Sequence, residues 1–142
     1  MRIIGNFLAI FFTALLLVSC QQKEPNQLCG TWRMVNGIYK GPDFTVETNE
    51  DKRICYKLIS EKNFAVIEMF KSNPESLFFA AVGHYEWDDT SYVEHYEASN
   101  VPTKIGETER FTSRLDGDLW HISMKSQDME LEETWRRVVS EE

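Results

Sequence analysis

From residue 28 onward, apolar and polar residues alternate in short stretches that are separated by clusters of turn-forming residues. Val, Ile, Phe, Tyr, Trp and Thr are common within the stretches, and such alternation is typical of half-buried β-strands. The pattern predicts eight strands, which cover residues 28–36, 52–60, 63–71, 77–87, 91–98, 107–115, 119–126 and 130–139.

The connections between these stretches favour antiparallel neighbours. Residues 88–90, 116–118 and 126–128 are short enough for hairpin turns, and Gly117 can adopt the positive φ that such turns need. Residues 72–75, Ser-Asn-Pro-Glu, break the chain between the third and fourth stretches, and the longer connections are residues 37–51 and 99–106. Eight strands joined in this way can close into a barrel without exposed edges, whereas a two-sheet sandwich, the alternative, usually needs longer crossing connections. We therefore predict an all-β fold, an eight-stranded antiparallel up-and-down barrel.

The last stretch is the one segment where helix propensity competes with this prediction. Residues 129–137 are rich in helix-forming Met, Leu, Glu and Arg. The alternation of Leu131, Glu133, Trp135 and Arg137 with their neighbours favours a strand instead, and the barrel needs a final strand to close. We therefore predict a strand.

The N-terminal segment differs in composition from the rest of the chain. Residues 3–18 are apolar and follow a single positive charge at Arg2, which is typical of a signal peptide. The run falls short of the roughly 20 residues that a transmembrane helix needs. Its end, Leu-Val-Ser-Cys at residues 17–20, resembles the bacterial lipobox. This resemblance implies that Cys20 is acylated and becomes the first residue of the mature protein.

Three parts are therefore expected: a lipoprotein signal peptide at residues 1–19, a lipidated tether at 20–27 and a barrel domain at 28–142. Acyl chains on Cys20 would hold the protein on a membrane surface, because each buried methylene contributes about 0.8 kcal/mol. We expect a lipid-anchored protein of the bacterial cell envelope, with the outer membrane as its location.

Charge and motifs narrow the possible functions. The formal net charge is −8, which argues against nucleic acid as a partner and against electrostatic docking to anionic lipid. The chain has no Gly-rich phosphate loop, no Gly-x-Ser-x-Gly elbow, no His-Glu-x-x-His and no closely spaced cysteine pair for zinc. We expect no cofactor and no metal, and an enzyme is not indicated, although Glu94 and Glu133 could form an acid–base pair.

Two motifs at the ends of the predicted barrel resemble those of lipocalins. Gly30-Thr31-Trp32 resembles the Gly-x-Trp signature of that family, and residues 135–137, Trp-Arg-Arg, resemble its closing strand. The resemblance implies that an arginine, Arg136 or Arg137, packs across Trp32 at the closed end of the barrel. Residues 83–87 and 92–96 further resemble the middle strands of small, uncharacterised lipocalin-like (calycin-type) bacterial lipoproteins.

Side chains two positions apart share a face of a barrel strand, and we assign the more polar set of each strand to the outside. On residues 52–60 this rule places Ile54, Tyr56 and Leu58 inside and Arg53, Cys55 and Lys57 outside. The strand at 63–71 is ambiguous, because Glu68 shares its face with three apolar residues. In the other strands the inward set is Trp32, Tyr85, Trp87, Tyr92, Glu94, Tyr96, Phe111, Ser113, Leu115, Trp120, Ile122, Met124, Glu133, Trp135 and Arg137. The three histidines, His84, His95 and His121, are placed outside.

This inward set mixes aromatic rings with charges. Buried charges are costly unless they are paired, so the inward charges need mutual partners or a ligand. We therefore predict a membrane-anchored barrel that binds one small, partly hydrophobic or amphiphilic molecule. The predicted ligand-binding residues are Tyr85, Trp87, Tyr92, Glu94, Tyr96, Trp120, Glu133 and Trp135. The alternative is a filled barrel that serves as a structural or interaction module of the cell envelope, which an exposed apolar face at Phe78, Ala80 and Val82 would favour.

Cys29 and Cys55 are both assigned to the outside of neighbouring strands, so a cross-strand disulfide between them is geometrically allowed outside the cytoplasm. Two free thiols are the alternative.

Overall fold

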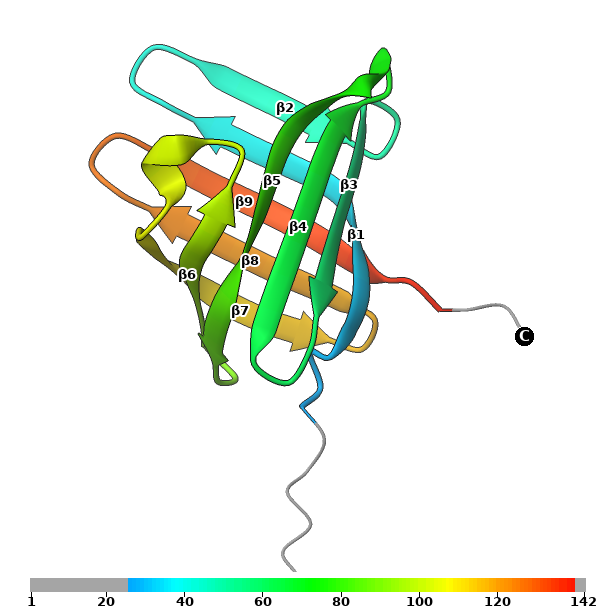
Figure 1. Ribbon diagram of the computed structural model, residues 1–142, viewed down its shortest axis with the longest axis vertical. Coiled ribbons are helices and arrows are strands. Elements are labelled where there is room, and N and C mark those ends of the chain that lie inside the picture. Colours follow the sequence, from blue (N-terminus) through cyan, green and yellow to red (C-terminus); the bar gives the residue numbers. More distant parts are fainter. Residues whose placement is uncertain (1–25, 140–142) are drawn as a thin grey trace, which may run out of the picture.

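A computed structural model describes residues 26–139, which form nine β-strands and one short 3₁₀-helix (Figure 1). The predicted signal peptide, Cys20 and most of the predicted tether lie outside the described residues. The elements are β1 (Gly30–Lys40), β2 (Thr45–Asn49), β3 (Arg53–Ile59), β4 (Asn63–Phe70), β5 (Asn73–Trp87), β6 (Ser91–Ser99), η1 (Pro102–Lys104), β7 (Thr108–Asp116), β8 (Leu119–Lys125) and β9 (Glu130–Arg137).

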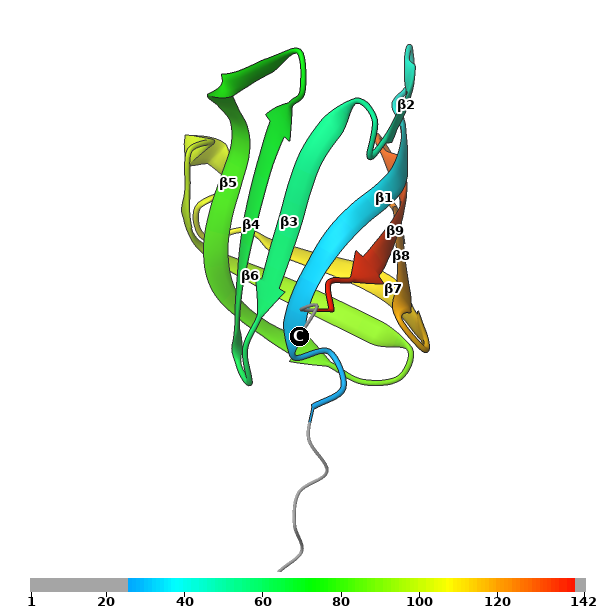
Figure 2. The same cartoon turned by 90° about the vertical axis from the view of Figure 1, so that its right-hand side faces the viewer.

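The sheet closes on itself through the first and last strands. From β3 to β9 each strand pairs antiparallel with the next, and β1 pairs with β3 on one side and β9 on the other. Figure 2 shows β1 between these two strands. The result is a closed eight-stranded antiparallel barrel, as predicted. The strand predicted over 130–139 against helix propensity is confirmed as β9.

Two local predictions were wrong. The 37–51 connection contains β2, which pairs with the end of β1 from Asn36 to Lys40. The break expected at 72–75 is a shorter turn, since β5 already begins at Asn73 and includes Pro74. The β4–β5 ladder has register shifts on both sides of Met69, and such irregular pairing is where a strand tolerates proline.

The two ends of the barrel differ in how tightly they are packed. At one end, which we call the Trp32 end, Leu28, Trp32 and Trp120 are fully buried. At the opposite end, which we call the Tyr39 end, the inward-facing side chains of Tyr39 and Leu131 are only partly buried. The barrel is therefore filled at the Trp32 end and more accessible at the Tyr39 end.

Gly30 and Arg137 together close the Trp32 end. The Arg137 guanidinium lies 4.2 Å from the centroid of the Trp32 ring and donates to the carbonyl oxygens of Gln27 (2.6 Å) and Cys29 (2.9 Å). Gly30 has a φ of 141°, and a Cβ there would lie 2.9 Å from an Arg137 nitrogen. The positive φ therefore favours glycine here, and a larger side chain would also crowd the arginine that covers the tryptophan.

Strand β3 is turned the opposite way from the sequence prediction. Arg53, Cys55 and Lys57 are buried inside the barrel, whereas Leu58 is 47% exposed on its outside. Tyr56 and Ile54 share the outward face of Leu58. The rule that polar residues face outward fails here because the inward charges have partners inside the barrel.

The outward side chains of β3 continue an apolar surface across β4 and β5. The pairing aligns three rows of uncharged residues, which we call the outer apolar face: Leu58, Ala65 and Val82; Tyr56, Ile67 and Ala80; Ile54, Met69 and Leu77. Leu58, Ile67, Leu77 and Val82 are among the exposed large hydrophobic residues. Apolar residues on β3 therefore find apolar neighbours outside the barrel rather than inside it.

The strands that close the barrel and the residues of its core lie between Leu28 and Arg137. A chain of residues 21–142 therefore contains the whole ring of strands with its core, and it is used for the solution experiments proposed here. Among the described residues, no helix is both long and apolar enough to cross a membrane.

Candidate functional site

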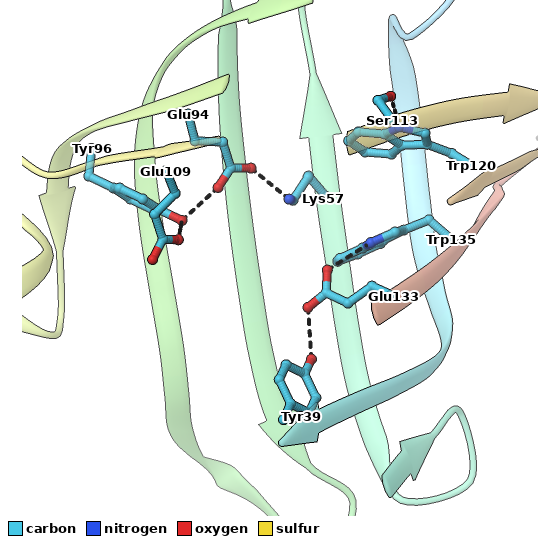
Figure 3. A network of polar contacts seen from close by, with 9 residues as sticks. All are labelled: Tyr39, Lys57, Glu94, Tyr96, Glu109, Ser113, Trp120, Glu133 and Trp135. Carbon is cyan, nitrogen blue, oxygen red and sulfur yellow. Dashed lines mark hydrogen bonds and ion pairs between the residues drawn. The ribbon is translucent and has the colours of Figure 1, made fainter. Parts of the chain in front are cut away.

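A buried ion pair lies in the middle of the barrel. Lys57 Nζ, from β3, lies 2.6 Å from Glu94 Oε1, from β6, and the two side chains are 5% and 2% exposed (Figure 3). The Tyr96 hydroxyl donates to the other Glu94 oxygen at 2.6 Å and also lies 2.8 Å from Glu109 Oε2. Glu94 is thus held from two sides, by a cation and by a neutral donor.

Aromatic rings enclose the Lys57 ammonium. Its nitrogen lies 5.0–6.0 Å from the ring centroids of Trp135, Tyr92, Trp120 and Phe111. Ring faces attract a cation, and the attraction is stronger when water is excluded. Burial alone would lower the pKa of Lys57, but the nearby carboxylates of Glu94 and Glu133 outweigh burial and raise it. Lys57 is therefore a permanent cation at neutral pH.

Glu133, from β9, is the second carboxylate close to Lys57. It accepts hydrogen bonds from the Tyr39 hydroxyl (2.8 Å) and from Trp135 Nε1 (3.0 Å), as Figure 3 shows. Both donors are neutral, and among the described residues no cation lies within ion-pair distance of Glu133. Burial raises its pKa, and the attraction of Lys57 only partly offsets that effect.

A second buried ion pair, Arg53 with Glu68, lies towards the Tyr39 end. The Arg53 guanidinium is within 4.7–5.7 Å of the ring centroids of Phe70, Phe78 and Tyr39. Glu68 lies inward, which resolves the ambiguous strand prediction. Contacts thus run continuously from Glu133 through Tyr39 to Arg53 and the two phenylalanines.

Side chains at the Tyr39 end face inward without being fully covered. Tyr39, Phe70, Met124 and Leu131 are each partly buried, and they come from four different strands. Phe78 is 47% exposed beside Phe70, with ring centroids 4.8 Å apart. The inner wall at this end is therefore aromatic and apolar, with Glu133, Lys57 and Glu94 deeper in the barrel.

The structure brings together most, but not all, of the predicted ligand-binding residues. The residues around Lys57 are Tyr92, Glu94, Trp120, Glu133 and Trp135, and Tyr96 joins them through Glu94. Tyr85 belongs to the Trp32 end, where its hydroxyl donates to the Ser60 carbonyl oxygen and accepts from Asn26. Trp87 is partly buried and donates to Ser113, which also accepts from Trp120. The indoles of Trp87 and Trp120 therefore both donate to the Ser113 hydroxyl oxygen.

Two cations of the site, Lys57 and Arg53, were not predicted to lie inside the barrel. Lys57 and Arg53 were assigned to the outer face, and Tyr39 fell in an expected connection. The signal that could have found Lys57 is the presence of carboxylates on other inward faces, Glu94 and Glu133, that need a cation. That signal becomes unambiguous only once the pairing of β3 with β4 is known.

Arg137, and not Arg136, covers Trp32. Arg136 points outward, where its guanidinium lies 2.5 Å from Glu50. His84, His95 and His121 lie on the outer face, as predicted, and the His84 and His95 rings stack at 4.5 Å. No group of three potential metal-ligating side chains occurs in residues 26–139.

The disulfide considered from the sequence is not formed, and both cysteines are free. Gly30 pairs with Ile59, so Cys29 lies opposite the end of β3, about five residues or roughly 16 Å along the sheet from Cys55. Cys55 also faces inward and Cys29 does not. Burial, followed by the Glu61 carboxylate, raises the pKa of Cys29, whose sulfur contacts Glu61 at 3.7 Å.

The comparisons with known proteins identify a family but no function. Neither the curated proteins nor the solved structures gave a match to the chain. A family model described as a domain of unknown function, DUF4488, matches residues 27–142, which include all nine strands. The chain, a closed eight-stranded barrel with a charged and aromatic interior, therefore belongs to the DUF4488 family.

Proposed function

We propose that the protein is a lipocalin-like lipoprotein, anchored to a bacterial envelope membrane by lipid on Cys20, that binds one small, partly hydrophobic molecule through the Tyr39 end of its barrel. The observation that carries the binding proposal is the contrast between the two ends. The Trp32 end is closed by Arg137, whereas aromatic and apolar side chains at the Tyr39 end face inward and remain partly exposed. A pocket with apolar walls and a few polar groups is typical of small-molecule sites.

The binding part of the proposal is tested with residues 21–142. Decanol is titrated while tryptophan fluorescence is followed, because Trp135 donates to Glu133 and lies on the route from the Tyr39 end. Saturable binding supports the proposal. Leu131→Glu places a charge on the inner wall at that end and should weaken binding at least tenfold. Leu119→Glu, on the outer face at the other end, is the matched control and should bind as the unmodified chain does. Equal affinity in both variants would contradict the proposal.

The anchoring part is tested separately with the full chain. Expression in a bacterial host followed by mass spectrometry of the N-terminal peptide should show an acylated Cys20 as the first residue. A Cys20→Ser chain should then appear in the soluble fraction. A chain that still carries residues 1–19 and has an unmodified Cys20 would refute the anchoring proposal. The binding proposal would not be affected.

The outer apolar face favours a second candidate, a module that docks another protein. Its nine uncharged side chains, in three rows, cover roughly 300 Å². A stable interface buries about 800 Å² on each partner, so this face would form only part of one. A second copy is disfavoured by the net charge of −8 on each chain. The occupant would be a different protein with an apolar surface and a neutral or basic rim.

A photo-reactive residue at position 67, in the centre of the outer apolar face, tests this second candidate in intact cells. One discrete protein should be cross-linked from position 67 and not from position 112, which faces outward on β7. Binding of that purified protein should be lost in Ile67→Asp. No cross-link, or equal products from both positions, would exclude it.

A further inference from the structure

The charged groups inside the barrel do not balance. Arg53 and Lys57 are the buried cations, and Glu68 and Glu94 are their partners. Glu109, beside Tyr96, is paired with Lys104. Glu133 is the remaining inward carboxylate, and within the described residues it is bound only by the neutral donors Tyr39 and Trp135. The interior therefore carries one more acid than base. An unpaired charge in such a place costs several kcal/mol, and a cation that joins it removes that cost.

Two further polar atoms near this network lack a partner. The Tyr92 hydroxyl and Arg53 Nε are buried and make no hydrogen bond within the described residues. Tyr92 is fully buried, and its ring lies 5.3 Å from Lys57 Nζ, beside Glu94. Buried polar groups are almost always paired, so unpaired ones in the same interior as an uncompensated carboxylate point to a missing polar group.

The surroundings of Glu133 suit a cation better than an anion. Tyr39 and Trp135 hold the carboxylate from two sides with neutral hydrogen-bond donors, and neither neutralises its charge. Lys57 and Arg53 are already paired with Glu94 and Glu68, so neither cation is free to bind an added anion. Apolar side chains of the Tyr39 end, including Phe70, Met124 and Leu131, lie towards the outside and can cover an aliphatic part.

We infer that the molecule bound at the Tyr39 end is a cationic amphiphile, whose ammonium or similar positively charged group pairs with Glu133 while its apolar part lies along the inner wall. This inference rests on the proposed function and adds the chemical class of the ligand. It requires that the barrel prefer a positive head group over a neutral or negative one on the same chain.

The test uses decylamine, decanol and decanoate with residues 21–142, because the three molecules differ only in the head group. At pH 7.5 decylammonium should bind at least tenfold more tightly than decanol, the size expected for one charge-assisted contact, and decanoate most weakly. In Glu133→Gln the advantage of the amine over the alcohol should disappear while decanol binding is kept. Glu132→Gln, which removes the adjacent outward carboxylate, is the matched control and should keep the advantage.

Each outcome decides a different claim. If decanol binds as tightly as decylammonium, or if Glu133→Gln keeps the preference, the cationic ligand is refuted and the proposed function stands. If none of the three molecules binds, the proposed function falls, and this inference falls with it.

The pH dependence gives a second readout that does not need a variant. The groups that face Glu133 are Tyr39 from β1, Cys55 and Lys57 from β3, Glu68 from β4 and Glu94 from β6, and Ile122 lies opposite it on β8. Burial raises the pKa of Glu133 above its usual value, so this carboxyl group gains its charge as the pH rises. The amine advantage should therefore grow between pH 5 and pH 8, where an alkylammonium stays charged, roughly as lysine does. A constant advantage across this interval would contradict pairing with Glu133.

Discussion

Replacing Lys57 by methionine should strongly destabilise the barrel. Methionine has a similar length and removes only the charge and its hydrogen bonds. Glu94 would then keep the Tyr96 hydroxyl as its one remaining donor, at 2% exposure, with Glu133 nearby and no cation between the two carboxylates. The change therefore leaves an uncompensated buried charge and increases repulsion inside the barrel.

The magnitude follows from the geometry of the pair. Removing one partner of a buried ion pair costs about 3–5 kcal/mol. Lys57→Met should lie near the upper end of this range, because the ammonium also loses its contacts with four aromatic rings. Glu94→Gln should cost less, about 1–3 kcal/mol, because Lys57 retains Glu133 as a nearby carboxylate. The double variant Lys57→Met with Glu94→Gln has no unpaired charge from this pair and should lie within about 2 kcal/mol of the unmodified chain.

Urea unfolding of residues 21–142, followed by tryptophan fluorescence, measures all four free energies of unfolding. The cycle should give a coupling energy of at least about 2 kcal/mol, as expected for contacting residues. Lys125→Met is the control, because Lys125 is 79% exposed in a surface pair with Glu130 and should cause no measurable change. A Lys57→Met chain within about 1 kcal/mol of the unmodified one, or two single effects that simply add, would refute the reasoning.

Three further predictions concern the framework of the barrel. Gly83→Ala should cost about 1–3 kcal/mol in urea unfolding, since a Cβ there would lie 1.9 Å from the His95 carbonyl oxygen and force the β5–β6 pairing apart; unchanged stability would show that the ladder yields freely. Arg137→Gln should cost about 2–4 kcal/mol, because it removes the Trp32 stacking and two charge-assisted hydrogen bonds to carbonyl oxygens; an unchanged urea midpoint would mean that the Trp32 end closes without it. In residues 21–142, a thiol reagent at pH 8 should label Cys29 and not Cys55 in the folded state, because burial raises the pKa of Cys55 and excludes the reagent, and both should react in urea; equal labelling rates in the folded protein would contradict the inward position of Cys55.

The architecture was predictable because alternation and turn chemistry act locally. Gly117 has a φ of 59° between β7 and β8, as the turn prediction required. Asp88 accepts hydrogen bonds from the backbone nitrogens of Thr90 and Ser91, which fixes the β5–β6 turn. The inward tryptophans followed from the same alternation, since indoles are too large and apolar to be left outside a small barrel.

The direction in which β3 faces could not be predicted, because it depends on residues far away in the chain. Alternation gives two faces of a strand without saying which one is inside. Lys57 is acceptable inside only because Glu94 and Glu133 come from β6 and β9, and Leu58 is acceptable outside because Ala65 and Val82 continue the outer apolar face. Both reasons are tertiary. The partner of a buried charge is invisible while each strand is considered alone.

The buried ion pairs therefore determine the register of β3 more than they increase the free energy of unfolding. If β3 slipped by one residue, Ile54, Tyr56 and Leu58 would enter the barrel and its cations would leave, as hydrophobicity alone favours. That slip would leave Glu68 and Glu94 inside without Arg53 and Lys57, at a cost of several kcal/mol for each carboxylate. Apolar replacement of both pairs would remove this penalty, so such a chain could keep its stability while losing the distinction between the two registers. The ion pairs thus oppose the one alternative pairing that the sequence of β3 would otherwise prefer, and in doing so they hold Lys57 beside Glu133, where the proposed ligand binds.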